Sequence, residues 1–390
     1  MKRLGAWAVT TLILLALAFA LSCGGSASKG TWTATATRYY AVADSNNSRV
    51  LIYDAPFTTN QNASLVLGRT DFAQGGAEPA ATQSSLAFPT AVTFDSGGNL
   101  WVADTDHRRV MEFVPPFANT MSASLVLGEP SFTSVSTGVS QSQFTSPQGV
   151  AVDRNGDVWV SDPFASRVLE FTPPFSNGMN ASLVLGQPDF TTSNRTTSAN
   201  GLRYPGGLAF DPNGNLWVAD TYNNRVLQYT PPFANGMNAT LVIGQTDFIS
   251  NLNATTQSGL WNPAGVSFDA KGNLWVADYW NGRVLEYVPP FTSGMAATLV
   301  LGQPDYVKRN WAATANGAST PSGLAFDSAG RILVSDRLNN RVVIYQPPFS
   351  NGMNAATVIG QPDFNSSSAN QGNANPGANS LSWPLLGTTF

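Results

Sequence analysis

A six-fold repeat of one short motif constrains this 390-residue chain more than any other feature. Ala or Ser is followed by Asp, then by four further residues and Arg-Val, and the motif recurs every 58 to 60 residues. The pairs are Asp44/Arg49, Asp104/Arg109, Asp162/Arg167, Asp220/Arg225, Asp278/Arg283 and Asp336/Arg341. A period of this size is typical of repeat architectures, in which each unit packs against its neighbours. We therefore expect residues present in every unit to serve the fold, and binding residues to lie where the units differ.

Each unit is predicted to contain four short strands. In the unit that starts at Pro205, apolar runs at 205–211, 216–220, 225–229 and 238–243 are separated by turns rich in Gly, Asn and Pro. Only 11% of the residues are charged, and Val, Thr, Phe and Trp are frequent, which favours an all-β chain. Four antiparallel strands per repeat are typical of a β-propeller blade.

The sizes of the residues in these runs indicate how each blade is oriented. The first run carries a small residue, which suits an innermost strand where blades converge: Ala91, Gly149, Gly207, Gly265 and Gly323. The second run carries a large residue suited to packing between sheets, namely Trp101, Trp159, Trp217 and Trp275. The first unit begins with a second-type run at 39–44, and the chain ends with a first-type run at 384–390. We predict a six-bladed ring over residues 36–390, closed by the C-terminal strand completing the first blade, because closure removes two exposed sheet edges.

The strings Pro147–Val168, Pro205–Val226, Pro263–Val284 and Pro321–Val342 resemble NHL repeats. The resemblance covers all six units and implies an NHL-type propeller. The chain departs from the usual unit in its longer connection between blades, for example residues 245–262. Proteins of this kind include an amidoglycolate lyase, sensor domains of bacterial kinases, RNA-binding repressors and secreted proteins of unknown role, so the fold does not select the function.

The N-terminus has the pattern of an export signal. Lys2 and Arg3 precede an apolar stretch at 6–21, which is short for a membrane-spanning helix. Residues 1–22 are predicted to be a signal peptide, and 23–35 a flexible tether rich in Gly, Ser and Thr that starts with Cys23. The segment around Cys23 resembles a bacterial lipobox, which implies lipidation and export to the outer membrane or cell surface. The alternative is an ordinary signal peptide with a chance cysteine; an intramolecular disulfide is impossible with one Cys.

The recurring charged residues are interpreted as structural. Each repeated Asp ends one strand and its Arg opens the next across a four-residue loop, which permits a charge-assisted hydrogen bond. A cation-binding ring of carboxylates is the alternative, but these residues are not on the strand expected to line the channel. A second set of aspartates precedes a Gly-containing turn and is predicted to bind its backbone: Asp95, Asp153, Asp211, Asp269 and Asp327.

Residue types suited to catalysis are scarce. His107 is the one histidine, and no cluster has the spacing of metal ligands, so we expect no metal and no cofactor. The amidoglycolate lyase uses several histidines around zinc, so its chemistry does not transfer to this chain. A lactonase-like propeller with a carboxylate-bound ion is the enzymatic alternative. A net charge of −4 without basic runs offers no electrostatic basis for nucleic-acid binding.

The positions that break the repeat are the better candidates for binding. The loops between second and third strands are expected to share one face with the long connections, and binding residues favour such loops. The candidates are His107, Arg108, Phe164, Tyr222, Trp261, Tyr279, Trp280, Trp311 and Arg337. Aromatic rings beside Asn and Arg suit a sugar or a peptide; the alternative is that each ring packs onto its own blade.

These observations lead to one expectation of function and one alternative. We expect a monomeric, non-catalytic binding or scaffold module of the bacterial envelope, anchored to the membrane by lipid and binding a glycan, a peptide or a partner protein on its loop-rich face. The alternative is a divalent-metal-dependent hydrolase or lyase acting in the central channel.

Overall fold

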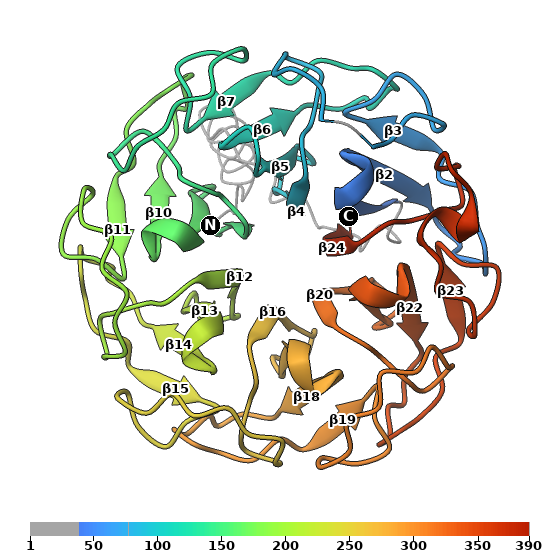
Figure 1. The fold of residues 1–390 in the computed structure, drawn as a ribbon. Helices are drawn as coiled ribbons and strands as arrows, with labels where there is room; N and C mark the ends of the chain where they lie inside the picture. Colours follow the sequence, from blue (N-terminus) through green and yellow to red (C-terminus); the bar gives the residue numbers. More distant parts are fainter. Residues whose placement is uncertain (1–38, 77, 390) are drawn as a thin grey trace, which may run out of the picture. The chain divides into compact units, whose positions relative to one another are not determined.

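The computed structural model describes residues 39–389 except residue 77. These residues form six four-stranded antiparallel sheets, arranged as blades around a common axis (Figure 1). This confirms the predicted all-β, six-bladed propeller. The predictions for the signal peptide, for Cys23 and for the tether concern residues that lie outside the described part of the chain.

The strands of each blade are given from the inner to the outer edge. Blade 1 holds β24 (Pro384–Thr389), β1 (Tyr39–Asp44), β2 (Arg49–Asp54) and β3 (Leu65–Leu67). Blade 2 holds β4 (Pro89–Phe94), β5 (Leu100–Asp104), β6 (Arg109–Phe113) and β7 (Leu125–Leu127). Blade 3 holds β8 (Val150–Val152), β9 (Val158–Asp162), β10 (Arg167–Phe171) and β11 (Leu183–Leu185).

The remaining blades follow the same order. Blade 4 holds β12 (Pro205–Phe210), β13 (Leu216–Asp220), β14 (Arg225–Tyr229) and β15 (Leu241–Ile243). Blade 5 holds β16 (Pro263–Phe268), β17 (Leu274–Asp278), β18 (Arg283–Tyr287) and β19 (Leu299–Leu301). Blade 6 holds β20 (Pro321–Phe326), β21 (Ile332–Asp336), β22 (Arg341–Tyr345) and β23 (Thr357–Ile359).

Small residues allow the inner strands to approach one another closely. A Cβ added to Gly149 would lie 2.4 Å from the carbonyl oxygen of Gly206 in the next blade. One added to Gly207 would lie 2.9 Å from the carbonyl oxygen of Ala264. Residues of all six inner strands line a hollow of about 230 Å³ on the axis. The inner strands therefore enclose a channel, as the small residues predicted.

Aromatic rings fill the space between neighbouring blades. Trp217 of β13 packs edge to face against Phe291, with ring centroids 4.9 Å apart, and against Phe268 at 5.8 Å. Its indole nitrogen donates to Asp211, whose other carboxylate oxygen accepts from the backbone of the turn that follows β12. The same aspartate therefore caps the turn and satisfies a buried indole.

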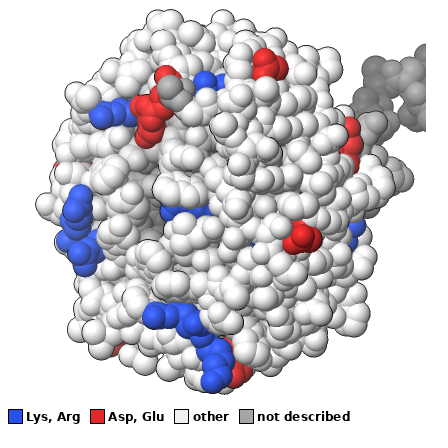
Figure 2. Space-filling view, turned by 45° about the vertical axis from the view of Figure 1, so that its right-hand side comes forward, with Lys and Arg blue, Asp and Glu red and all other residues white. Residues whose placement is uncertain are grey.

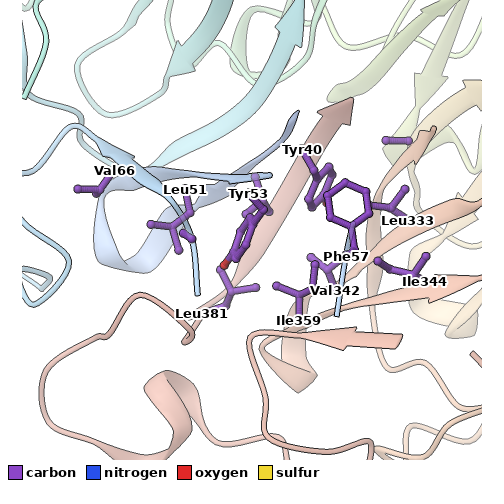
Figure 3. Packing of buried hydrophobic residues seen from close by; sticks show 13 residues of the cluster. Tyr40, Leu51, Tyr53, Phe57, Val66, Leu333, Val342, Ile344, Ile359 and Leu381 are labelled. Atoms are coloured by element: carbon purple, nitrogen blue, oxygen red, sulfur yellow. The ribbon is translucent and has the colours of Figure 1, made fainter. Parts of the chain in front are cut away.

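The C-terminal strand closes the ring. β24 pairs antiparallel with β1, and Tyr40, Ala41 and Val42 lie opposite Thr389, Thr388 and Gly387. Beside this seam, blades 1 and 6 share a buried apolar cluster (Figure 3). Its members include Tyr40, Leu51, Tyr53, Phe57 and Val66 from blade 1, and Leu333, Val342, Ile344 and Ile359 from blade 6. The first and last units are thus joined like any other pair of blades.

All six repeated Asp/Arg pairs form ion pairs whose side chains are fully buried. In blade 4, the Nε of Arg225 donates to Asp220 over 2.7 Å. Its two Nη atoms donate to carbonyl oxygens of the connection entering the blade, at Ser198 and Gly201, and of the connection leaving it, at Phe248. Each arginine therefore holds two long connections against the end of its own blade.

Among residues 39–389 other than 77, no helix has the length and hydrophobicity that a membrane span requires.

Candidate functional site: the mouth of the channel

A cavity of about 320 Å³ opens where the axis meets the loop-rich face. It is lined by the turns that follow β13, β17 and β21, and by residues that immediately precede inner strands. The lining residues with side chains suited to binding are Phe88, Gln148, Tyr204, Tyr222, Asn262, Tyr279, Trp280 and Arg337. Blades 4 to 6 contribute most of them, so the cavity is asymmetric within a pseudo-six-fold ring.

Three short 3-10 turns place the candidate side chains at this mouth. These are η3 (Thr221–Asn223), η4 (Tyr279–Asn281) and η5 (Arg337–Asn339). The third residue of each turn is a buried Asn, which donates to the Asp that ends the preceding strand over 2.7 to 2.8 Å. The Asp–Arg pair and this Asn therefore anchor the turn, while its first two positions vary between blades.

The aromatic residues at the mouth contact one another in two groups. Tyr204 stacks on Tyr222 with centroids 4.5 Å apart and planes inclined by 11°, and Phe164 meets Tyr204 edge-on at 5.3 Å. Tyr279 meets Trp280 edge-on at 5.0 Å. Such pairs add about 0.5–1.5 kcal/mol beyond area burial, so they stabilise the arrangement of the rings. Tyr222 nevertheless stays 45% exposed.

Among the described residues that line the cavity, Arg337 alone carries a formal charge. Its Nη1 donates to the hydroxyl of Tyr279 over 2.7 Å, and its Cζ lies 4.5 Å from the ring centroid of Trp383. Its Nε is buried and has no hydrogen-bond partner among the described residues. The described residues that line the cavity include no Asp, Glu or Lys. The guanidinium is thus held in position without being neutralised.

Three residues that line the cavity, and Trp383 beside Arg337, adopt a left-handed backbone immediately before a proline. The φ angles are 49° for Phe88, 57° for Tyr204, 51° for Asn262 and 53° for Trp383. This conformation is uncommon for bulky residues and is kept where the surroundings enforce it. In three of the four, the backbone N–H donates to the side chain of the residue that follows the 3-10 turn of the preceding blade. Phe88 donates to Ser48, Asn262 to Asn224 and Trp383 to Asn340.

These pre-proline positions were not among the sequence candidates, which came from the loops between second and third strands and, at Trp261 and Trp311, from the long connections between blades. A usable pattern was present, because the residue before the first strand's proline varies between units: Phe88, Ser146, Tyr204, Asn262, Thr320 and Trp383. Gln148, which lies just before β8 of blade 3, was not a candidate either; its amide donates to the hydroxyl of Tyr204 over 3.3 Å. Burial raises the pKa of the Tyr204 phenol.

The structure separates the sequence candidates into three groups. Tyr222, Tyr279, Trp280 and Arg337 line the cavity. Phe164 and Trp311 sit beside it, since Phe164 contacts Tyr204 and Trp311 lies 6.1 Å from Trp280 between ring centroids. Trp261 packs instead under Arg309, whose Cζ is 4.5 Å from its ring centroid.

His107 and Arg108 do not reach the mouth. His107 is 6% exposed; its Nδ1 lies 2.9 Å from an Asp104 carboxylate oxygen, and its Nε2 is 3.0 Å from the Pro79 carbonyl oxygen. It occupies the turn position that Asn holds in blades 1, 4, 5 and 6, at Asn47, Asn223, Asn281 and Asn339. Arg108 donates to the carbonyl of Ser136. Neither side chain lines the cavity at the mouth of the channel.

The electrostatics around His107 follow from burial and from its acidic neighbours. Burial opposes protonation, but the hydrogen bond and the charge of Asp104 outweigh it, so the pKa of His107 is raised. Burial and a hydrogen bond with Glu78 raise the pKa of the neighbouring Asp106 to about 7. Within the described part of the chain, no three His, Cys, Asp or Glu side chains are grouped so as to hold a metal ion. Figure 2 shows charged side chains scattered over the face in view, without an extended patch of one sign.

Comparison with known proteins gives a family match to four of the six units. The family model described as NHL repeat matches residues 144–168, 202–229, 260–287 and 319–345, which lie in blades 3 to 6. The chain therefore carries NHL repeats within a six-bladed β-propeller, and the resemblance stated from its sequence is confirmed for the repeats and the fold.

Curated relatives share part of this chain. Peptidyl-glycine alpha-amidating monooxygenase B of Xenopus laevis is 27% identical over 202 residues, which are 50% of this chain and 21% of that protein. Peptidyl-alpha-hydroxyglycine alpha-amidating lyase 1 of Drosophila melanogaster is 27% identical over 164 residues, or 38% of this chain and 28% of that protein. The chain thus spans between a fifth and three tenths of the length of these relatives.

A solved structure reproduces the fold at low sequence identity. A chain in a crystal structure of a nidogen–laminin complex superposes with a TM-score of 0.52 and 15% identity, over 90% of this chain and 97% of that one. At this identity the similarity is one of fold alone.

Proposed function

We propose that this propeller is a non-catalytic binding module whose ligand enters the mouth of the channel on the loop-rich face. One observation carries the proposal: the cavity wall is built from the positions at which the six units differ, and it is rich in aromatic side chains. A ligand without six-fold symmetry must be recognised by residues that differ between blades. A concave site with aromatic walls and a few polar groups is the usual form of a small-ligand site.

The exposure of the rings argues against the alternative that each aromatic residue serves only to pack onto its own blade. Tyr222 and Trp280 contact neighbouring rings, yet Tyr222 is 45% exposed and both line the cavity. Among the described residues, neither the Tyr222 hydroxyl nor the Trp280 indole nitrogen makes a hydrogen bond within the protein. These groups are therefore available to a ligand.

A double variant tests the site. A ligand is first found by glycan array or by pull-down from envelope extract. Tyr222→Ala with Trp280→Ala should then weaken binding at least about tenfold, or 1.4 kcal/mol, because aromatic anchors dominate binding energies. Ile249→Ala is the control, since Ile249 is a 77% exposed apolar side chain that does not line the cavity. Unchanged affinity in the double variant would exclude this site, and a collapse in stability would assign the rings to packing.

The amidating lyase relatives favour a second candidate, a metal-dependent lyase or hydrolase. The residues do not fit the zinc site of several histidines that the sequence resemblance implies, because His107 is the one histidine and both its nitrogens are occupied. Incubation of the purified chain with a peptidyl-α-hydroxyglycine and divalent ions distinguishes the candidates. Metal-dependent turnover would replace the binding module by an enzyme.

We infer that the propeller works at the envelope as a monomer anchored through Cys23, at the outer membrane or cell surface. The support is the charged, apolar and lipobox-like pattern of residues 1–23. Cys23→Ser should move the protein from the membrane fraction to the soluble fraction. Membrane association that is unaltered by this change would contradict the anchor.

A further inference from the structure

The charge balance of the mouth cavity indicates what part of a ligand it attracts. Arg337 carries the one formal charge among the described residues that line the cavity, and no ion pair involves it in the described part of the chain. A half-buried cation without a counter-ion is unfavourable by itself and favours an arriving anion. The contacts to Tyr279 and Trp383 orient the guanidinium and leave its charge unbalanced.

The geometry of Arg337 favours a carboxylate over a phosphate. Its Nη2 donates no hydrogen bond to the described protein, and its Nη1 makes a single bond, to the Tyr279 hydroxyl. A guanidinium presents parallel N–H groups that match the two oxygens of a carboxylate. A phosphate monoester carries a charge of about −1.5 to −2 at neutral pH, whereas one Arg balances a single charge.

The rest of the wall suits a hydroxylated ring. Tyr222 has one face covered by Tyr204 and keeps 45% of its surface exposed, and Trp280 lies on the neighbouring turn. Flat aromatic surfaces pack against the C–H face of a sugar ring. The side-chain amide of Asn262 and the indole N–H of Trp280 make no hydrogen bond within the described protein, so both can bind ring hydroxyls. A volume of about 320 Å³ is small for a ligand site and suits one end of a glycan.

We propose that the mouth cavity binds a carboxylated saccharide of the uronic acid class. The carboxylate meets Arg337, and the sugar ring lies against Tyr222 and Trp280. This inference rests on the proposed function, because it names the ligand class of the same site. A peptide C-terminus offers the carboxylate without the flat hydroxylated ring, and its binding is one of the outcomes that the test separates.

Calorimetric titration of the purified full chain tests the proposal with defined probes. The probes are D-glucuronate, a short uronate oligosaccharide, neutral D-glucose and a short unblocked peptide. Arg337→Thr removes the charge and introduces the residue found at the same turn position in blade 4, Thr221. Arg195→Thr is the matched control, because Arg195 is an exposed cation near Tyr204 that does not line the cavity.

The expected pattern has three parts. A uronate probe binds, glucose binds at least about tenfold more weakly, and Arg337→Thr weakens uronate binding at least about tenfold, equivalent to 1.4 kcal/mol. Arg195→Thr leaves the affinity unchanged. If Arg337→Thr lowers the melting temperature, Arg337→Lys replaces it, because Lys keeps the charge but loses the planar fork and should still weaken binding.

Other outcomes overturn the inference in distinguishable ways. Equal binding of glucose and glucuronate removes the role of the carboxylate, binding of the peptide alone removes the saccharide, and absence of uronate binding at millimolar concentration refutes the ligand class. A ligand from the array or extract that is lost in Tyr222→Ala/Trp280→Ala but kept in Arg337→Thr would refute this inference while the proposed site stands. A ligand kept in both variants would refute both.

Discussion

Replacement of Arg225 by Met should test how the repeated ion pairs hold the propeller together. In the folded chain this side chain is fully buried and donates to Asp220, Ser198, Gly201 and Phe248. Met has similar length but no donors. The variant therefore leaves a buried carboxylate without its counter-ion and removes the arginine donor from three backbone carbonyl groups, of which that of Ser198 keeps the backbone N–H of Gly201.

The size of the effect follows from these contacts. Removal of one partner from a buried ion pair costs about 3–5 kcal/mol. An unsatisfied buried carbonyl costs about 1–3 kcal/mol, although water entering beside the released connections offsets part of this. Asp220 keeps its bonds from the Arg203 backbone N–H and from Asn223, so it is not wholly uncompensated. We expect the free energy of unfolding to fall by at least about 3 kcal/mol.

Urea unfolding followed by tryptophan fluorescence and circular dichroism measures this loss, and coincident transitions justify a two-state treatment. Adding Asp220→Asn to Arg225→Met removes the buried charge and should recover about 1–3 kcal/mol, so the two changes are not additive. Arg195→Met is the control, because Arg195 is exposed and should change stability by less than about 0.5 kcal/mol. A loss below about 1 kcal/mol in Arg225→Met, or strict additivity in the double variant, would refute this account of the pairs.

Three further predictions concern the inner strands, the ring seam and the histidine. Gly149→Ala places a Cβ 2.4 Å from the Gly206 carbonyl oxygen, so the free energy of unfolding in urea should fall by about 1–3 kcal/mol. An unchanged free energy of unfolding would mean that the inner strands can move apart without cost. Deleting residues 384–390 removes β24 and exposes the edge of β1, so we expect aggregation in size-exclusion chromatography or a fall of several kcal/mol in the free energy of unfolding. An unchanged melting temperature would contradict the closure of the ring by β24. His107→Asn should change stability by less than about 1 kcal/mol at neutral pH, because Asn makes the equivalent bond in blades 1, 4, 5 and 6. The pKa of His107 is raised in the folded chain, so its protonation contributes fully to the free energy of unfolding below the pKa of the unfolded chain, and this contribution is lost as pH rises through the folded-state pKa. Over that pH window the wild type should lose stability relative to His107→Asn. Parallel stability–pH profiles for the two proteins would contradict the bond to Asp104.

The sequence alone was enough to determine the architecture, because each feature that specifies it is local and repeated. The period of the Asp/Arg motif set the number of blades, and small residues such as Gly207 identified the inner strands. The incomplete units at 39–44 and 384–390 predicted the closure that β24 and β1 form. Repetition helped, because a pattern that recurs six times at a nearly fixed period indicates a shared structural role.

Only the tertiary structure determined which residues form the site, because the spacing of residues along the sequence does not fix how far each side chain lies from the propeller axis. Tyr222 and Trp261 are both aromatic residues of variable segments, yet Tyr222 lines the cavity while Trp261 packs under Arg309. Tyr204 was missed because its approach to the mouth depends on a left-handed backbone before Pro205. The cavity is lined by side chains of several blades, which come together only in the closed ring. The sequence alone therefore did not show that Arg337 lies there without an acidic neighbour.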